Sequence, residues 1–577
     1  MTLRRLLRVV SVVVIAALAY TAWLAWQVQR DLRDAESSAF DLRTSWTSGD
    51  SGSRDEAEAD LVESAAAAQH HTSGLWWRAL GHVPVVGDDA RGVAAMSRSL
   101  DVIAQNALTP LCDTVDKLEG LIRNGRIDLD AVAGLEPAVE RAYRALTVAD
   151  DELAGLDSSG YVGALRIGFD RYAALVDGLR SGLASADEAV AVLPTMAGAE
   201  GPKNYLLLFQ NNAEIRATGG MPGSWALLHA EDGELSMARQ GTAGDFPTAV
   251  TSVLPLTSEE ETVYGDELGL YFQDPGWTPD FPRAAELWHA HWDQRFPRLP
   301  IDGVVALDPV GMSYLLDGTG PVTVDDVTLT RDNAVEELLN KPYVEERPVA
   351  QNMFFAKASR SIFEAATGSL ASPMAFVEGL NRAAGEGRLL VASFDGRVTS
   401  ELAGTPVEGA LAGDDGTTPH TDIGLNDLTG SKMSYYLRYY AEVDAISCRG
   451  GVQDLAGTLT LKQVISPNQA ASLPSSVTGG GKFGIDPGSQ YVMVRIYGPY
   501  SGTIDQVRLN GRTLEDGLIH ELGDRPVANV DVLLSSRKDV LISWRGRTGP
   551  GQTSGGELSV TPSVVSGTDR RPFGTAC

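Results

Sequence analysis

At 577 residues, the chain is too long for a single hydrophobic core, and three or four domains are expected. Hydrophobic residues make up 43% of it and charged residues 21%, which is typical of folded protein and argues against wholesale disorder. The formal net charge of -29 argues against nucleic acid as a partner, because a phosphate backbone requires a basic surface. The same charge disfavours broad electrostatic adhesion to anionic lipid.

The N-terminus predicts a membrane anchor. An apolar run of 18 residues, Val9–Trp26, is close to the ~20 residues that cross a bilayer, and its far end carries Trp23 and Trp26, which suit an interfacial aromatic belt. Three basic residues precede the run: Arg4, Arg5 and Arg8. By the positive-inside rule, residues 1–30 form a cytoplasmic tip and a single transmembrane helix, and the bulk of the chain is extracytoplasmic at the cell membrane. The alternative is a cleavable signal peptide, since Ala17-Leu18-Ala19 resembles a cleavage site.

Residues 31–198 have the period of amphipathic helices and predict a helical stalk and bundle. Two apolar stripes repeat every three or four residues: Leu111, Val115, Leu118 and Ile122, and then Leu165, Phe169, Tyr172, Val176, Leu179 and Leu183. Between the stalk and these stripes lies an apolar patch, Leu75-Trp76-Trp77 followed by Pro84-Val85-Val86-Gly87. This patch has two interpretations: it packs one helix on the next, or it docks on the membrane surface near the anchor.

Residues 199–430 alternate between strands and helices and predict an α/β domain. Its opening stretch, Asn204–Arg239, contains a strand at 205–209, a polar glycine-rich loop, and a hairpin of two strands, 225–229 and 235–239. The hairpin turn is Asp232-Gly233, a strong signal for this connection. Further along, Trp288 and Trp292 lie one helical turn apart on a predicted helix. The loop that follows the first strand presents a cluster of functional groups on a rigid scaffold, so it is the candidate site.

Residues 431–577 predict a β-sandwich, because about seven short strands follow one another between segments rich in Gly, Pro, Asn and Ser. The whole chain is therefore expected to be a multidomain α+β protein. An exported chain is compatible with one disulfide, and Cys448 and Cys577 are the preferred pair because both lie in this region. The third cysteine, Cys112, lies in a helical stretch and is expected to be a buried apolar side chain.

Within the candidate loop, Arg216 could bind a pyrophosphate or carboxylate in a solvent-facing cleft, or it could form an internal ion pair with Glu214 or another acid. Glu214 is itself a candidate ligand-binding residue, as a general base or a metal ligand, although nothing nearby in the sequence marks its partner. Asn211 and Asn212 could bind a sugar or a metal-bound water, or their amides could satisfy backbone groups of the loop. The paired glycines Gly219-Gly220 could form an anion-binding nest or simply permit a tight turn. No residue pattern predicts a protein-held metal site.

Three segments resemble a family known as domain of unknown function 4012, common in high-GC Gram-positive bacteria. They are NYLLLFQNNAEIRATGGMPGSW at 204–225, DGVVALDPVGMSYLLDGTGPVTV at 302–324 and NDLTGSKM at 426–433. The family has no assigned activity, so the resemblance implies an architecture and a cell-envelope location without a reaction.

The order of elements more distantly resembles the LytR–CpsA–Psr phosphotransferases, which attach glycopolymers from polyprenyl-pyrophosphate carriers to the cell wall. By this resemblance, Arg216 and Arg239 would contact pyrophosphate, Asp245 would be the third catalytic residue, and Mg²⁺ could be a cofactor. The sequence departs from that family's pattern at two places. Asn211-Asn212 stands where the family has a loop aspartate, and the third strand ends without an Arg-Asp dipeptide.

Two functions are therefore expected. The first is a membrane-anchored, extracytoplasmic cell-envelope protein that binds or transfers a lipid-linked glycopolymer, with a polyprenyl phosphate or cell-wall glycan as partner. The second is a non-catalytic envelope scaffold that binds glycan or another protein. The missing carboxylates favour the scaffold, whereas the strand–loop–hairpin order favours the transferase.

Overall fold

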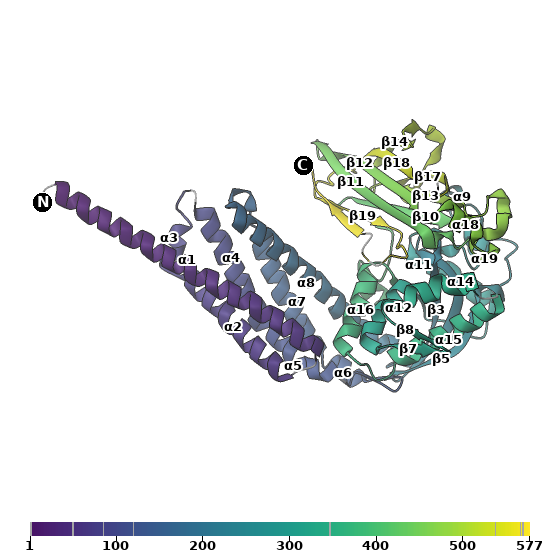
Figure 1. Cartoon of the computed structure of the whole chain (residues 1–577), viewed down its shortest axis with the longest axis horizontal. Helices are drawn as coiled ribbons and strands as arrows, with labels where there is room; N and C mark the ends of the chain where they lie inside the picture. The colour runs from purple at the N-terminus through teal and green to yellow at the C-terminus, as the bar shows by residue number, and fades with distance from the viewer. Residues whose placement is uncertain are drawn as a thin grey trace. The chain divides into compact units, whose positions relative to one another are not determined.

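The computed structural model describes residues 3–48, 51–84, 86–118, 120–345, 348–536, 538–565, 567 and 570–577. The chain forms two compact units, a helical unit of residues 1–121 and 128–194 and a mixed unit of residues 122–127 and 195–577 (Figure 1). Each unit has its own hydrophobic core. The fold is therefore a multidomain arrangement of helices and strands.

The helical unit contains long antiparallel helices in which the N-terminal part of α1 projects beyond the others (Figure 1). Its elements are α1 (Leu3–Ser48), α2 (Ser51–Ser73), α3 (Leu75–Leu80), α4 (Gly87–Ile103), the π-helical η1 (Ala104–Leu108), α5 (Thr109–Leu118), α6 (Leu129–Ala133), α7 (Glu136–Ala154), η2 (Ser158–Gly160) and α8 (Gly163–Met196). Phe169 and Val176 of the second predicted stripe pack in the core of this unit. Leu179 is 48% exposed, so the stripe is wrong at that position.

The first predicted stripe is also too long. Helix α5 ends at Leu118, and Ile122 begins the short strand β1 (Ile122–Arg123), which pairs with β2 (Arg126–Ile127). The turn between them places Asn124 and Gly125 at positive φ, a conformation that these two residue types adopt readily and that ends any helix. The strand pair belongs to the mixed unit, since β2 extends the sheet of that unit.

Among the described residues, no helix combines the length and the apolarity needed to span a bilayer. The side chains of Arg4, Arg5 and Arg8 lie outside the described part of the structure.

The mixed unit opens with a seven-stranded sheet in the order β1-β2-β5-β4-β3-β6-β9. Its other strands are β3 (Lys203–Arg216), β4 (Gly219–Glu231), β5 (Glu234–Thr242), β6 (Gly303–Leu307) and β9 (Leu389–Ser393). Strands β3 and β6 are parallel, and the other pairs are antiparallel. The predicted turn between β4 and β5 is confirmed, with Asp232 and Gly233 both at positive φ.

Alternate residues of the sheet contribute to two apolar cores. On one face, Leu206 and Leu208 pack with the fully buried Trp288 and Trp292 of α11 (Phe281–Arg295), the helix on which the sequence placed the two tryptophans. On the other face, Leu307 packs with a second group of helices. The helices and short strands of this region are α9 (Ser258–Tyr264), α10 (Glu267–Leu270), α12 (Pro309–Thr319), β7 (Val322–Val324), β8 (Val327–Leu329), α13 (Ala334–Leu339), α14 (Lys341–Glu345), α15 (Pro348–Ala366), α16 (Pro373–Gly385) and α17 (Gly396–Leu402).

The remaining strands form two sheets that share one apolar core (Figure 1). The six-stranded sheet has the order β16-β17-β13-β10-β19-β20, and the five-stranded sheet has the order β11-β12-β18-β14-β15. The strands are β10 (His420–Asp427), β11 (Leu437–Arg449), β12 (Val452–Gln463), β13 (Gln490–Tyr497), β14 (Thr503–Leu509), β15 (Arg512–Thr513), β16 (Ile519–Leu522), β17 (Arg525–Leu534), β18 (Val540–Arg547), β19 (Gly556–Val560) and β20 (Arg570–Phe573). Two short helices, α18 (Pro467–Ser472) and α19 (Ser475–Thr478), lie between β12 and β13.

A disulfide joins Cys448 of β11 to Cys577, the pair that the sequence favoured. Cys112 is a buried free thiol, and burial raises its pKa to about 12. The end of β3 reaches the core between the two C-terminal sheets, where Ile215 is one of the buried side chains. The candidate segment therefore lies where the seven-stranded sheet meets the sandwich of β10–β20.

Candidate functional site

The segment predicted as a polar loop is a β-hairpin instead. Strand β3 continues through the amides, the acid and the arginine to Arg216, and a two-residue turn at Ala217-Thr218 leads directly into β4. Regular pairing is interrupted between Asn211 and Ile215, so three residues bulge out of register with β4. A bulge of this kind redirects side chains from one face of a sheet to another. Sequence reasoning missed the hairpin because polar residues in a strand look like a loop when their burial is unknown.

Arg216 lies inside the protein and is only 5% exposed. One guanidinium nitrogen, Nη1, donates hydrogen bonds to the carbonyl oxygens of Ile215 and Asp427 at 3.0 and 3.1 Å. The other, Nη2, lies 3.4 Å from Glu214 and 3.7 Å from Asp274. The expectation of a solvent-facing guanidinium is therefore wrong, and the internal ion pair with Glu214 is the arrangement found.

Glu214 is bound by two cations, because Lys432 forms a close ion pair with its second carboxylate oxygen. Burial alone raises the pKa of Glu214, but Lys432 and Arg216 outweigh it and hold the pKa below its ordinary value. Two further acids lie nearby, and burial raises the pKa of Asp274 and of Asp427 to about 6. The result is a buried charge network in which both cations already have resident carboxylate partners.

The two asparagines also bind other parts of the fold. The amide of Asn211 donates to the Tyr343 hydroxyl at 2.6 Å, and its oxygen accepts from the backbone N–H of Ala213 at 3.0 Å. The amide of Asn212 donates to Asp308 at 2.8 Å, and Asp308 in turn forms an ion pair of 2.9 Å with the fully buried Arg388. Only the contact between Asn211 and Ala213 matches the interpretation in which the amides satisfy backbone groups of the loop, because the other two contacts are with side chains of other elements.

The paired glycines are required by a close approach of backbone. A Cβ on Gly220 would lie 2.2 Å from the carbonyl carbon of Asn211, and Gly219 has a φ of +130°. The absence of a Cβ at Gly220 and the positive φ of Gly219 let β4 pass close to the bulge of β3. The backbone around both residues is buried. A tight approach of two strands explains both glycines without an anion.

The three residues predicted to be catalytic are not brought together. Arg239 pairs across the sheet with Leu227 and, through it, with Leu206, ten residues before Arg216 on β3. The exposed guanidinium of Arg239 lies over the ring of Phe296, 5.1 Å from its centroid. Asp245 is exposed beyond the end of β5, where its carboxylate accepts from the backbone N–H of Thr242.

The same geometry bears on the Mg²⁺ that the phosphotransferase resemblance implies. Asp245 is engaged at a turn, and Glu214 is already neutralised by Arg216 and Lys432, so the two carboxylates do not share a site. Among the described residues, no group of three or more His, Cys, Asp or Glu is arranged to hold a metal ion. The donors present do not fit the implied cofactor.

One feature of the site was not predicted. A cavity of about 320 Å³ lies between β3–β5 on one side and α12–α15 on the other. Its lining is mostly apolar and includes Phe209, Met221, Met312, Leu338, Phe355 and Ile362, together with the polar Asn211, Gln240, Tyr343, Asn352 and Lys432. Small residues of α15, such as Ala356 and Ser359, line the cavity and leave its volume unfilled. Their spacing of one helical turn is the sequence feature that could have indicated the cavity.

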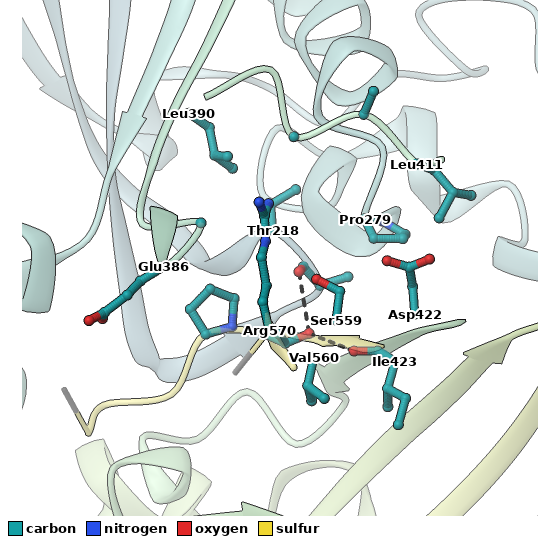
Figure 2. Close-up of a pocket in the computed structure, with 16 residues that line it drawn as sticks. Thr218, Pro279, Glu386, Leu390, Leu411, Asp422, Ile423, Ser559, Val560 and Arg570 are labelled. Carbon is teal, nitrogen blue, oxygen red and sulfur yellow. Dashed lines mark hydrogen bonds between the residues drawn. The ribbon is translucent and has the colours of Figure 1, made fainter. Parts of the chain in front are cut away.

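A second, smaller pocket of about 70 Å³ lies where the β3–β4 turn meets the six-stranded sheet. Arg570 extends along it toward Thr218, between Glu386 and Asp422 (Figure 2). The hydroxyl of Thr561 donates to the carbonyl oxygens of Ala217 and Ile423 at 3.3 and 3.4 Å. A space of this size suits a few bound waters and no larger ligand.

Comparison with known proteins identifies one family. Residues 200–343 match the family model described as "Protein of unknown function (DUF4012)", which covers β3–β8, α13 and the residues between them. No curated protein and no solved structure matches the chain, so the likeness to the LytR–CpsA–Psr phosphotransferases has no support from these comparisons. Residues 200–343, which include strands β3–β6 of the seven-stranded sheet and the turn after Arg216, are therefore similar to the DUF4012 family.

Proposed function

We propose that this chain is a membrane-anchored, extracytoplasmic cell-envelope protein that binds the lipid portion of a lipid-linked glycopolymer and does not transfer it. The observation that carries this proposal is the apolar cavity between the sheet and α12–α15. Its volume of about 320 Å³ is at the lower end of the range for small-molecule sites.

The lining of the cavity suits an apolar chain. Met312, Leu338 and Ile362 offer flexible aliphatic surface, and Phe209 and Phe355 offer aromatic surface. Each methylene of a ligand that leaves water for such a site contributes about 0.8 kcal/mol. A polyprenyl chain has enough apolar surface to fill the cavity and continue beyond it.

The polar part of the lining suits a phosphate. Of the described residues that border the cavity, only Lys432 is charged, and its ammonium lies 5.4 Å from the centre of the Tyr343 ring. An ammonium has three donors, and Glu214 needs only one of them. Asn211 lies beside Tyr343 and adds a polar group to the same part of the lining.

Binding is favoured over transfer because the groups needed for phosphoryl chemistry do not meet. A pyrophosphate transferase stabilises the developing charge with several cations, usually together with a metal ion. Arg216 is buried in an ion pair, and Arg239 and Asp245 lie elsewhere on the sheet. One lysine at the cavity can hold a phosphate but cannot neutralise a transferring one.

The apolar run Val9–Trp26 supports the membrane part of the proposal, because lipid carriers of this class reside in the bilayer. An anchor keeps the cavity at the surface from which such a lipid is taken.

The experiment is native mass spectrometry of the full chain after gentle detergent extraction. We expect a copurifying polyprenyl phosphate that is lost in Met312→Trp, which fills the cavity, and retained in Met353→Trp. Met312 is 5% exposed and lines the cavity, whereas Met353 is 57% exposed on α15, so the pair matches the chemical change and differs in location. Detecting no lipid on the wild-type chain, or equal lipid on both variants, rejects the proposal.

A second candidate is the non-catalytic scaffold. Its specific support is the burial of Glu214 and Arg216 where β3 meets the sandwich, which gives the characteristic polar residues of this segment a structural task. Pull-down of envelope glycan or a protein by the wild-type chain and by Met312→Trp alike, without lipid, would favour the scaffold.

A further inference from the structure

The short helix α3 and the turn that follows it present apolar side chains to solvent. Leu75 is 80% exposed, Trp76 38%, Val83 43% and Val86 45%. The neighbouring Trp77 behaves differently, since it is 7% exposed and its indole N–H donates to the carbonyl oxygen of Ala90 at 2.8 Å. The interpretation that the aromatics pack one helix on the next is therefore confirmed for Trp77 and does not account for Leu75 or Trp76.

This surface lies against the C-terminal end of the apolar run of α1. The indole N–H of Trp76 donates to the hydroxyl of Thr21 at 3.0 Å, and its ring meets Tyr20 edge-on at 5.5 Å. Leu24 and Val28 of α1 form a small core with Trp77 and Ala90, which holds α3 at this level of α1. The position of α3 along α1 is therefore set by packing and by a hydrogen bond.

The exposed side chains of α1 near this level are also aromatic. Tyr20, Trp23 and Trp26 are 46%, 49% and 56% exposed. Together with Leu75, Trp76, Val83 and Val86 they form an apolar belt of side chains from two separate segments, α1 and the stretch from α3 to the start of α4. Tryptophan and tyrosine are the residues that concentrate at the headgroup level of membrane proteins, because one end of each ring is apolar and the other is polar.

We propose that this belt lies in the bilayer interface, so that the α3–α4 turn is a second membrane contact beside the anchor helix. The inference rests on the anchor of the proposed function and goes beyond it, because an anchor alone requires nothing of residues 75–86. The segment from Leu75 to Arg91 has two arginines and two aspartates, so its contact with lipid is apolar and does not need anionic headgroups.

Two contacts on one bilayer also restrict motion. A single helix leaves the rest of the chain free to tilt, whereas a helix and a neighbouring turn held at one level fix the angle at which the helical unit leaves the membrane. The belt is proposed to contact the interfacial region of a zwitterionic bilayer, because its side chains are apolar and aromatic and the segment carries as many arginines as aspartates.

The test uses the full chain in phosphatidylcholine nanodiscs, labelled at single introduced cysteines with a polarity-sensitive fluorophore. Cys112 is buried with a raised pKa and the other two cysteines are joined, so the wild-type chain is the labelling blank. Labels are placed at Leu75→Cys and Val83→Cys in the belt, at Leu18→Cys in the anchor, and at Glu136→Cys at the start of α7. Quenching is measured with a quencher attached to the lipid near its headgroup.

We expect the labels at Leu75 and Val83 to lose about half of their emission, as for side chains of a helix that lies in the interface, while the label at Glu136 is unchanged. Quenching at Leu18 without quenching at Leu75 or Val83 overturns this inference and leaves the anchor standing. If none of the labels is quenched, both the belt and the anchor are rejected. Quenching at Leu75 and Val83 in anionic lipid alone would also contradict the apolar contact proposed here.

Discussion

The buried charge network at the end of β3 makes a sharp prediction about two arginines that the sequence treats alike. Arg216 and Arg239 lie on β3 and β5, within the residues that match the DUF4012 model, and the phosphotransferase resemblance gives both the same role. In the structure Arg216 is 5% exposed, whereas Arg239 is exposed and rests on the ring of Phe296. Replacing each by methionine keeps an unbranched side chain about as long as the aliphatic stem of arginine and removes the charged guanidinium.

The Arg216→Met change leaves Asp274 without its cation, removes one of the two cations on Glu214, and removes the donors to the carbonyl oxygens of Ile215 and Asp427. Removal of one partner from a buried ion pair costs about 3–5 kcal/mol. Because Lys432 still neutralises Glu214, we expect about 3 kcal/mol. Arg239→Met loses a surface contact with an aromatic ring, and we expect less than about 1 kcal/mol.

The cost of Arg216→Met should also depend on pH. Without the guanidinium, the pKa of Asp274 rises further and the pKa of Glu214 rises from its lowered value, so the folded variant holds protons that the folded wild type releases. The variant is therefore least stable relative to wild type at about pH 8 and recovers part of the loss near pH 5.

The assay is urea unfolding of the full chain, followed by hydrogen exchange and mass spectrometry of peptides from β3 and β10. Local peptides are needed because the chain has two units whose unfolding can overlap. A loss for Arg216→Met within about 1 kcal/mol of the loss for Arg239→Met, at pH 8, would refute the account of a buried structural arginine.

Two more predictions concern residues of the same network and hairpin. The pKa of Asp274 is raised to about 6 by burial, against about 4 in the unfolded chain, so this group contributes stability that is full below about pH 4 and is lost as pH rises through 6. Asp274→Asn should remove that dependence. Between pH 5 and 7.5, the free energy of unfolding in urea should therefore fall by about 1 kcal/mol less for the variant than for wild type. Parallel plots of the free energy of unfolding against pH would contradict the raised pKa. Gly220→Ala should destabilise the domain by at least about 2 kcal/mol, because its Cβ would lie 2.2 Å from the backbone of Asn211. In the control Gly223→Ala, the new Cβ meets only the end of the flexible Met221 side chain at 3.6 Å, so the loss should be less than about 1 kcal/mol. Thermal unfolding compares the two glycine variants, and equal losses would show that the strands do not cross as described.

Local chemistry was enough to predict several elements of this fold. The Asp232-Gly233 turn follows from the positive φ that these residues tolerate, and the hairpin around it follows from that turn. The spacing of Trp288 and Trp292 predicted the helix α11, on which both residues lie. Signals of this kind are contained within one or two turns of chain, so no knowledge of distant residues is needed to interpret them.

The candidate site could not be predicted in the same way. The string of amides, acid, arginine and glycines from Asn211 to Gly220 has the same composition whether it lines a cleft or joins two sheets. The choice between a cleft and a junction of sheets depends on Asp427 and Lys432, which lie more than 200 residues away in sequence. Asp427 meets Arg216 and Lys432 meets Glu214 only in the folded chain. The cavity is equally non-local, since its walls come from β3–β5 and from helices α12–α15.

The sequence by itself thus determined the N-terminal apolar run, the helical and mixed regions, the turn chemistry and the family resemblance. Only the tertiary structure decided which polar groups are buried and which apolar groups are exposed. The physical reason is that the energy of an ionised or apolar side chain depends on whether water surrounds it, and water is excluded by neighbours that the local sequence does not contain.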